Sequence, residues 1–326
     1  MDRRAFISGI TLGLLAASLA AEGQQAGRTY RIGYLFDGRP PDPRSPAKAL
    51  EETLSDLGYV EGKNLVVERR FAAFNDDRLP DLAAELVRLK PDLIVTGGNQ
   101  SIAALKQATT AVPIVMTWAM DPVGAGLVTS LARPGGNITG VSLSAGPEFV
   151  AKELGILSEI VPKLSRVAIL RQTGRPGAEP AVLESAARKL GLTILFADVR
   201  TPHDIEGAFA TMTRSRAGAF LMLGGSMTHA SRQQIADLAV QHRLPGIHLF
   251  RAYAEAGLLL TYGPDPAAQY RGVATYIDKI LKGARPADLP IQEPTQFELV
   301  INLKTAKALG LTIPPSLLQR ADQVIE

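Results

Sequence analysis

Short apolar runs alternate with amphipathic stretches from residue 30 onward. The apolar runs are Tyr30–Phe36, Leu65–Ala72, Leu93–Thr96 and Val112–Met116. Between them, apolar residues recur three and four positions apart, as in Ala49–Leu57. The short runs predict strands and the periodic stretches predict helices. Strands that alternate with helices in this way predict an α/β fold, with a parallel sheet built from βαβ units.

The second half of the chain repeats this order of elements. Its apolar runs are Arg166–Leu170, Thr193–Val199, Phe220–Leu223 and Leu244–Ile247, at spacings similar to those of the first half. Any doubly wound fold alternates strands and helices, but a shared turn strengthens the match between the halves. Matching elements in the same order favour two lobes of equal architecture. We therefore predict two doubly wound parallel-sheet lobes joined by a hinge.

The shared turn is a Gly-Gly pair followed by a polar residue. It reads Gly97-Gly98-Asn99 in the first half and Gly224-Gly225-Ser226 in the second, each time after an apolar run. In open parallel sheets, ligands lie beyond the carboxyl ends of the strands. Glycine lets the backbone approach a ligand, and the next helix offers free N–H groups to an anionic group. The two turns thus predict a cleft in which both lobes grip one solute, although the polar residues are also good helix caps.

The N-terminus has the pattern of an export signal. Arg3 and Arg4 precede an uncharged stretch, Ala5–Ala21, which Gly and Ser residues dilute and which is short for a bilayer span. We predict a signal peptide over residues 1–23, cleaved near residues 20–24, and hence a periplasmic protein.

Arg3–Ile7 also fits the twin-arginine pattern. The general and twin-arginine export routes are both compatible with the sequence. An N-terminal anchor and a helix of the mature domain are the alternatives to cleavage.

Composition narrows the function classes. The chain has 326 residues, a hydrophobic fraction of 46%, a formal net charge of +3 and no cysteine. This length favours two domains, and the absence of long basic runs argues against a nucleic-acid partner. Without cysteine there is no disulfide, no thiolate metal site and no lipidated Cys. We expect a mature form that is not membrane-embedded and acts as a monomer.

Motifs for catalysis are missing from the sequence. The four histidines, His203, His229, His242 and His248, have no zinc-ligand spacing, and no G-x-S-x-G elbow marks a nucleophilic serine. The glycines do not form a dinucleotide loop or a P-loop. We therefore expect a binding protein without catalytic residues, metal or cofactor, and not an enzyme.

Carboxylates and aromatic residues near the predicted strand ends are candidate solute contacts. Asp37, Asp121 and Asp265 are placed to pair with a ligand ammonium, or to cap turns. The aromatic candidates, which stack on a solute or pack in the core, are Phe36, Trp118, Phe250, Tyr253 and Tyr262.

Several segments resemble one family of ABC-transporter substrate-binding proteins, typified by the tryptophan-binding TrpX-like proteins. The C-terminal part carries the longest match. The matching segments are Leu57–Leu65, Asp121–Val123, Arg133–Ser142, Tyr262–Asp265, Gly283–Pro290 and Pro294–Leu318. They span nearly the whole mature chain.

The resemblance implies a periplasmic-binding-protein-like fold of type I. Its lobe 1 would comprise residues 28–143 and 263–326, and its lobe 2 residues 144–262. The solute contacts would come from the first strand end, both Gly-Gly turns, the Asp121 loop and the second crossover. These residues are Phe36, Asp37, Gly98, Asn99, Gln100, Trp118, Asp121, Ser142, Gly225, Ser226, Phe250, Tyr262 and Gly263.

The resemblance further implies capture of a small solute for an ABC importer, with a permease and its ATPase as partners. An amino acid or another small carboxylate is the favoured solute. Two departures, Trp118-Ala119-Met120 where relatives have a small residue and Ala256 in place of a glycine, keep tryptophan itself from being implied. A ligand-sensing domain that feeds a membrane receptor and a periplasmic enzyme are the competing hypotheses.

Overall fold

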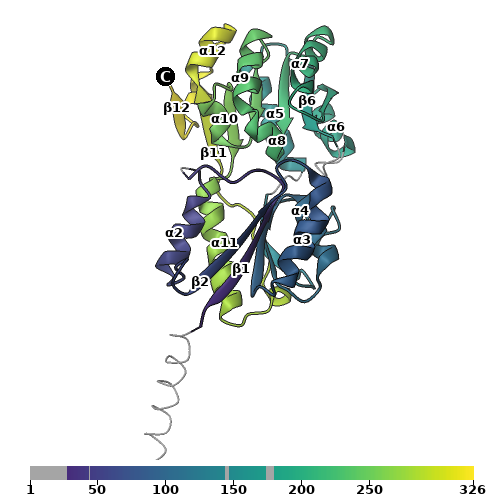
Figure 1. Ribbon diagram of the computed structural model, residues 1–326. Helices are drawn as coiled ribbons and strands as arrows, with labels where there is room; N and C mark the ends of the chain where they lie inside the picture. The colour runs from purple at the N-terminus through teal and green to yellow at the C-terminus, as the bar shows by residue number, and fades with distance from the viewer. Residues whose placement is uncertain (1–27, 44, 144–146, 174–179) are drawn as a thin grey trace, which may run out of the picture.

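The computed structural model describes residues 28–43, 45–143, 147–173 and 180–326. Two α/β lobes, each built around one sheet of mostly parallel strands, are stacked end to end (Figure 1). The predicted fold class is thereby confirmed. The predicted signal peptide over residues 1–23 lies outside the described residues.

Lobe 1 contains a five-stranded sheet in the order β2-β1-β3-β4-β5, and all neighbouring pairs are parallel. Nearly every side chain of β3, β4 and β5 is buried, as expected for parallel strands covered on both faces. The strands are β1 (Tyr30–Phe36), β2 (Leu65–Phe71), β3 (Leu93–Gly97), β4 (Ile114–Met120) and β5 (Ile138–Leu143).

Helices cover both faces of this sheet. Apolar residues of α2 and α11 pack on one face, and those of α3 and α4 pack on the other. The helices are α2 (Lys48–Asp56), α3 (Leu79–Arg88), α4 (Asn99–Ala108) and α11 (Pro266–Leu281), with the short 3-10 helices η1 (Asp76–Arg78) and η2 (Pro286–Asp288).

Lobe 2 contains a seven-stranded sheet in the order β12-β11-β10-β9-β8-β6-β7. Its part β7-β6-β8-β9 repeats the order β2-β1-β3-β4 of lobe 1, which agrees with the internal repeat in the sequence. The strands are β6 (Arg166–Gln172), β7 (Thr193–Val199), β8 (Ala219–Leu223), β9 (Gly246–His248), β10 (Leu260–Gly263), β11 (Glu298–Asn302) and β12 (Gln323–Ile325).

Helices also cover both faces of the second sheet. The first set, α5, α6, α12 and α13, packs on one face and the second set, α7 to α10, on the other. Their bounds are α5 (Pro147–Ile160), α6 (Pro180–Lys189), α7 (Asp204–Arg214), α8 (Ser226–Ala230), α9 (Arg232–Gln241), α10 (Arg251–Glu255), α12 (Leu303–Leu309) and α13 (Pro315–Leu318).

The end of the chain corrects the predicted lobe boundaries. We expected residues 263–326 to complete lobe 1, but only α11 and the segment up to Gln292 do so. β11 pairs antiparallel with β10, and Leu299 and Ile301 are buried in the core of lobe 2. Residues 298–326 therefore belong to lobe 2. Apolar periodicity identified β11 as a strand, but it carries no information on the strand with which it pairs.

The chain passes between the lobes at three places among the described elements. It crosses between β5 and α5, between β10 and α11, and between η2 and β11. This arrangement turns the carboxyl ends of the parallel strands of one lobe toward those of the other (Figure 1).

Among the described residues, no helix is long and apolar enough to cross a bilayer.

Candidate functional site

A hydrogen bond across the interface joins the end of β1 to the start of α8. The Ser226 hydroxyl of lobe 2 donates to Oδ1 of Asp37 in lobe 1. Asp37 is only 3% exposed, and Gly38 lies against Ser226, since a Cβ on Gly38 would be 3.3 Å from the Ser226 Cβ. Two of the predicted contacts are thus brought together from opposite lobes.

The first Gly-Gly turn lies beside this bridge. Gly98 has a φ of 81°, in the left-handed region that glycine adopts without strain, and a Cβ there would lie 3.5 Å from Asp37 Oδ2. At Gly97, a Cβ would lie 2.7 Å from the Phe36 ring and 2.9 Å from the Trp118 ring. The turn therefore runs between the buried carboxylate and two aromatic rings, with no room for a side chain at Gly97.

Aromatic rings form a second contact between the lobes. Trp118 of lobe 1 meets Phe250 of lobe 2 edge to face, with centroids 5.2 Å apart. The Trp118 indole also packs on Tyr270 of α11, to whose hydroxyl its Nε1–H donates at 3.1 Å. Phe36 stacks on Tyr34 at 4.3 Å. Trp118, Phe36 and Phe250 are half-buried.

Tyr34 and Tyr270 support these rings from within lobe 1. The Tyr34 hydroxyl is hydrogen-bonded to that of Tyr270, and burial raises the pKa of both. Both phenols stay neutral at physiological pH. We did not predict either residue as part of the site. Tyr34 lies two positions before Phe36 and so shares its face of the strand, a period-two signal that the sequence offers. Tyr270 has no comparable signal.

Asn99 and Asp121 are engaged inside lobe 1. The Asn99 side chain donates to the Met120 carbonyl at 2.7 Å and accepts from the Met120 N–H at 2.9 Å. Asp121 accepts from the Gly124 N–H at 2.9 Å and closes its own turn. Both side chains hold the loop after β4 in place. Their contact with a solute stays a prediction.

The remaining predicted contacts differ in burial, hydrogen bonding and packing. The Ser142 hydroxyl on β5 is buried and has no partner among the described residues, whereas Gln100 is half-buried at the start of α4. Gly225 precedes α8, and its N–H donates to Thr228 Oγ1. Gly263 is required by packing, because a Cβ there would lie 1.9 Å from the Leu249 carbonyl oxygen.

Tyr262 belongs to an aromatic cluster at the hinge. Its ring packs on Phe149 and Phe297, with the three centroids 5.5 to 5.7 Å apart. Each ring lies next to one of the three crossings between the lobes. One turn after Phe149 on α5, Glu153 is 3% exposed, and burial raises the pKa of its carboxyl group. We call Phe149, Tyr262, Phe297 and Glu153 the hinge cluster.

His248 lies beneath the second Gly-Gly turn. Its Nδ1 accepts from the Phe250 N–H at 3.0 Å, which leaves Nε2 as the protonated nitrogen of a neutral ring. Burial lowers the pKa of His248. A Cβ on Gly224 would lie 2.7 Å from Nε2, so this histidine supports the turn from below and requires glycine above it.

A further residue of the interface that the sequence did not indicate is Phe74. It lies in the loop after β2 of lobe 1, yet its ring packs against the core of lobe 2. Its φ of 70° is unusual for a phenylalanine.

No group of three or more His, Cys, Asp or Glu side chains in the described part of the chain is arranged to hold a metal ion.

Two parallel α/β lobes, with a charged group, a helix start and aromatic rings at their interface, define the class of two-lobed solute-binding proteins. The chain belongs to the ABC transporter substrate binding protein family, whose model matches residues 44–325. The resemblance found in the sequence is thus confirmed. Members of this family are substrate-binding proteins of ABC transporters.

Three relatives illustrate the similarity. A tyrosine-binding protein of Clostridioides difficile is 25% identical over 266 residues, which cover 81% of this chain and 76% of the relative. The crystal structure of an ABC domain from Streptococcus pneumonia in complex with L-Trp has a TM-score of 0.83 at 26% identity. A conserved domain protein from Vibrio cholerae has a TM-score of 0.84 at 28% identity. Each structural match covers 91% of this chain and 100% of the other.

Replacing Ser226 tests the bridge between the lobes. Ser226→Ala removes the hydroxyl that donates to Asp37, and a hydrogen bond to a charged group contributes about 1.5–3 kcal/mol. We expect the solute-free variant to open. Trp118 is the chain's single tryptophan and contacts Phe250 across the interface, so its emission should shift to the red while the radius of gyration rises. Ser231→Ala, outside the interface, is the matched control. Unchanged emission and scattering would show that the bond does not hold the lobes together.

The hinge cluster predicts a pH dependence of stability. Because the folded-state pKa of Glu153 is raised above its ordinary 4.5, the folded protein binds more protons than the unfolded chain above that pH. Stability is thus fully present below about pH 4.5 and is lost as the pH rises through the folded-state pKa. We expect Glu153→Gln to be more stable than wild type in urea at pH 8, with a smaller difference at pH 5. Glu159→Gln, at an exposed ion pair with Arg320, is the control. Equal pH profiles for wild type and Glu153→Gln would contradict this.

Proposed function

We propose that this protein captures an amino acid with an aromatic side chain between its lobes and delivers it to an ABC importer. The observation that carries the proposal is the Asp37–Ser226 bridge, which lies across the Gly97-Gly98 turn from the Trp118–Phe250 pair. A charged centre and aromatic surfaces within one interface match the two ends of such a solute.

The polar end of the solute has two partners of opposite charge, a carboxylate and the N-terminus of a helix. A buried carboxylate at Asp37 favours an ammonium group. The N–H groups in the first turn of α4 follow Gly98, and the positive end of a helix attracts a carboxylate. An α-amino acid has both groups on one carbon, so it can bridge Asp37 and the start of α4.

The apolar end of the solute is assigned to the rings. Aromatic pairs prefer offset-stacked or edge-to-face geometry and contribute about 0.5–1.5 kcal/mol beyond their buried area. The half-exposed Phe36, Trp118 and Phe250 offer such contacts. Two relatives point the same way, since one is described as tyrosine-binding and the other was crystallised with L-Trp.

Closure of the two lobes supplies the mechanism. In the open form, Asp37 and Ser226 are bonded to water; in the closed form they are bonded to each other and to the solute. A solute that touches both lobes binds the closed form more tightly and raises its population. The permease and ATPase of the importer would then recognise the closed protein.

Export to the periplasm is part of the proposal. The pattern of residues 1–23 supports it, as does membership of a family that serves transporters. We expect N-terminal sequencing of protein recovered from the periplasm to begin between residues 21 and 25. Recovery in the cytoplasm with Met1 intact would overturn the export step and leave the binding proposal standing.

A solute screen tests the binding step. We expect L-Tyr, L-Phe and L-Trp to raise the melting temperature, because a ligand at 100 times its Kd stabilises the folded state by about 2.7 kcal/mol. L-Leu, L-Glu and glucose should raise it less, and chromatography should find each solute unconsumed. Stabilisation by glucose alone would exclude the amino-acid class, and turnover would identify an enzyme.

A pair of aspartate variants completes this test. Asp37→Asn should weaken the affinity for the best amino acid by roughly 100-fold, since loss of one partner from a buried charge pair costs about 2–5 kcal/mol. Asp121→Asn changes the same group where it caps its own turn, and should leave the affinity near that of wild type. Calorimetric titration measures both. Equal losses would move the ammonium site away from Asp37.

A further inference from the structure

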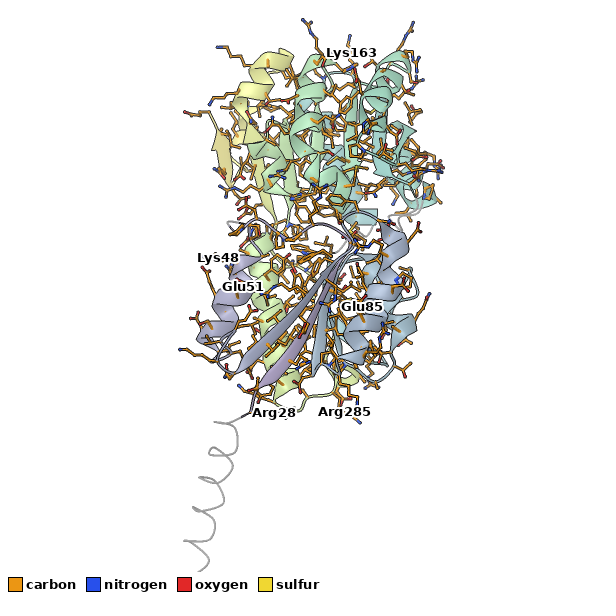
Figure 2. The ribbon with its side chains drawn as sticks, in the orientation of Figure 1. Arg28, Lys48, Glu51, Glu85, Lys163 and Arg285 are labelled. Carbon is orange, nitrogen blue, oxygen red and sulfur yellow. The ribbon has the colours of Figure 1, made fainter. Side chains whose placement is uncertain are left out.

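Four loops meet at the end of lobe 2 that lies away from the interface between the lobes. They precede the parallel strands β6, β7, β8 and β9 and, with the adjoining ends of helices and strands, span residues 161–166, 188–193, 214–218 and 241–246. Backbone hydrogen bonds of 2.9 Å link each to a neighbour, from Thr193 to Ser165, from Gly218 to Arg166 and from Phe220 to Pro245. Figure 2 labels Lys163 at this end of the molecule.

These loops are strongly basic. They contain no Asp or Glu, and their seven cationic side chains are all exposed. We call this set the basic pole; it consists of Lys163, Arg166, Arg188, Lys189, Arg214, Arg216 and Arg243. Since the whole chain has a formal net charge of +3, the rest of the chain carries 3 − 7 = −4. Among the described residues, only Arg188 of the pole forms an ion pair, with Glu184 at 3.7 Å.

Three of these cations occupy strained backbone positions. Lys163, Arg216 and Arg243 have φ values of 55°, 55° and 52°, in the left-handed region that glycine adopts without strain. A residue with a side chain loses roughly 1–2 kcal/mol in this conformation. Cations near helix C-termini interact favourably with the helix dipole, but a cation one residue earlier would do so without strain.

The pole also carries an exposed apolar residue. Leu190, which is 42% exposed, follows Arg188 and Lys189 directly. The loops contain no Phe, Trp or Tyr on which a nucleic-acid base could stack. Cations around an exposed aliphatic side chain are typical of contact with lipid headgroups.

The equivalent end of lobe 1 is balanced. Counted with the last helical residue, as in lobe 2, its loops 56–65 and 88–93 carry Lys63, Arg88 and Lys90 together with Asp56, Glu61 and Asp92. The loop 109–114 carries no charge, and the segment before β5 carries Arg133. Lobe 1 has the same strand and helix directions, so the helix dipoles alone do not explain the charge of lobe 2.

We infer that the basic pole binds the phosphate groups of an anionic lipid surface. This role goes beyond the proposed function: it holds the protein on the membrane in which an importer resides. The interface between the lobes lies at the opposite end of lobe 2, so an attached protein would still be able to open and load. Each Lys or Arg near an anionic membrane contributes on the order of a fivefold gain in binding, and the contact weakens with salt.

Vesicle binding tests the inference. We expect the full mature chain to co-sediment with vesicles rich in phosphatidylglycerol at low salt, and to be released at high salt or from pure phosphatidylcholine. The triple variant Lys163→Asn/Arg216→Asn/Arg243→Asn should bind about 100-fold more weakly. Asparagine tolerates the left-handed region, so the variant keeps its fold and its melting temperature.

Lobe 1 offers a matched control. Lys90 has a φ of 50°, so Lys90→Asn makes the same change in the same backbone conformation at the other end of the molecule. It should bind vesicles like wild type. The affinity for the amino acid should be unchanged in all variants, which separates this inference from the proposed function.

Three results would overturn the assignment. They are equal binding to both kinds of vesicle, equal losses in the triple variant and in Lys90→Asn, and tighter binding to a DNA duplex than to the anionic vesicles. Binding of wild type to the anionic vesicles but not to phosphatidylcholine, together with loss of that binding in the triple variant, would support it.

Discussion

The burial of one carboxylate between two lobes controls the rest of the site. Asp37 is nearly inaccessible, and a buried charge without partners is costly. Ser226 supplies one partner from the opposite lobe, so the bond can form only when the lobes are closed. Under the proposed closure mechanism, a solute that adds a positive charge at Asp37 favours the closed state only by the difference between its affinities for the two states.

The hinge cluster joins the three segments that connect the lobes. Phe149, Tyr262 and Phe297 lie beside different crossings, so their mutual packing keeps the three segments together. Burial of Glu153 beside them raises the pKa of its carboxyl group and makes the ionised form unfavourable. Activity that needs flexibility often carries a local cost in stability of this kind.

Much of the fold follows from local pattern, whereas the site depends on tertiary neighbours. Apolar periodicity and the repeated Gly-Gly turn were enough to predict two lobes and a cleft at the ends of β3 and β8. The same periodicity revealed β11 but not its partner β10, because pairing is a long-range choice. From sequence alone, Asn99 and Asp121 are as suitable for solute contact as Asp37. In the structure, Asn99 bonds to Met120 at the end of β4, and Asp121 bonds within its own turn. Tyr270 reaches Trp118 from a helix 152 positions later, a distance that no sequence pattern records.

Parallel strand direction links the two ends of lobe 2. Where strands end and helices begin, free N–H groups and the positive ends of helix dipoles favour anions, which suits the carboxylate of a solute. Where helices end and strands begin, the negative dipole ends favour Lys and Arg. Lobe 1 has the same strand and helix directions, but the cations in its corresponding loops are accompanied by acidic residues such as Glu61 and Asp92. The dipoles therefore permit the basic pole without requiring it, and the strained cations at Lys163, Arg216 and Arg243 are a cost that the fold itself does not impose.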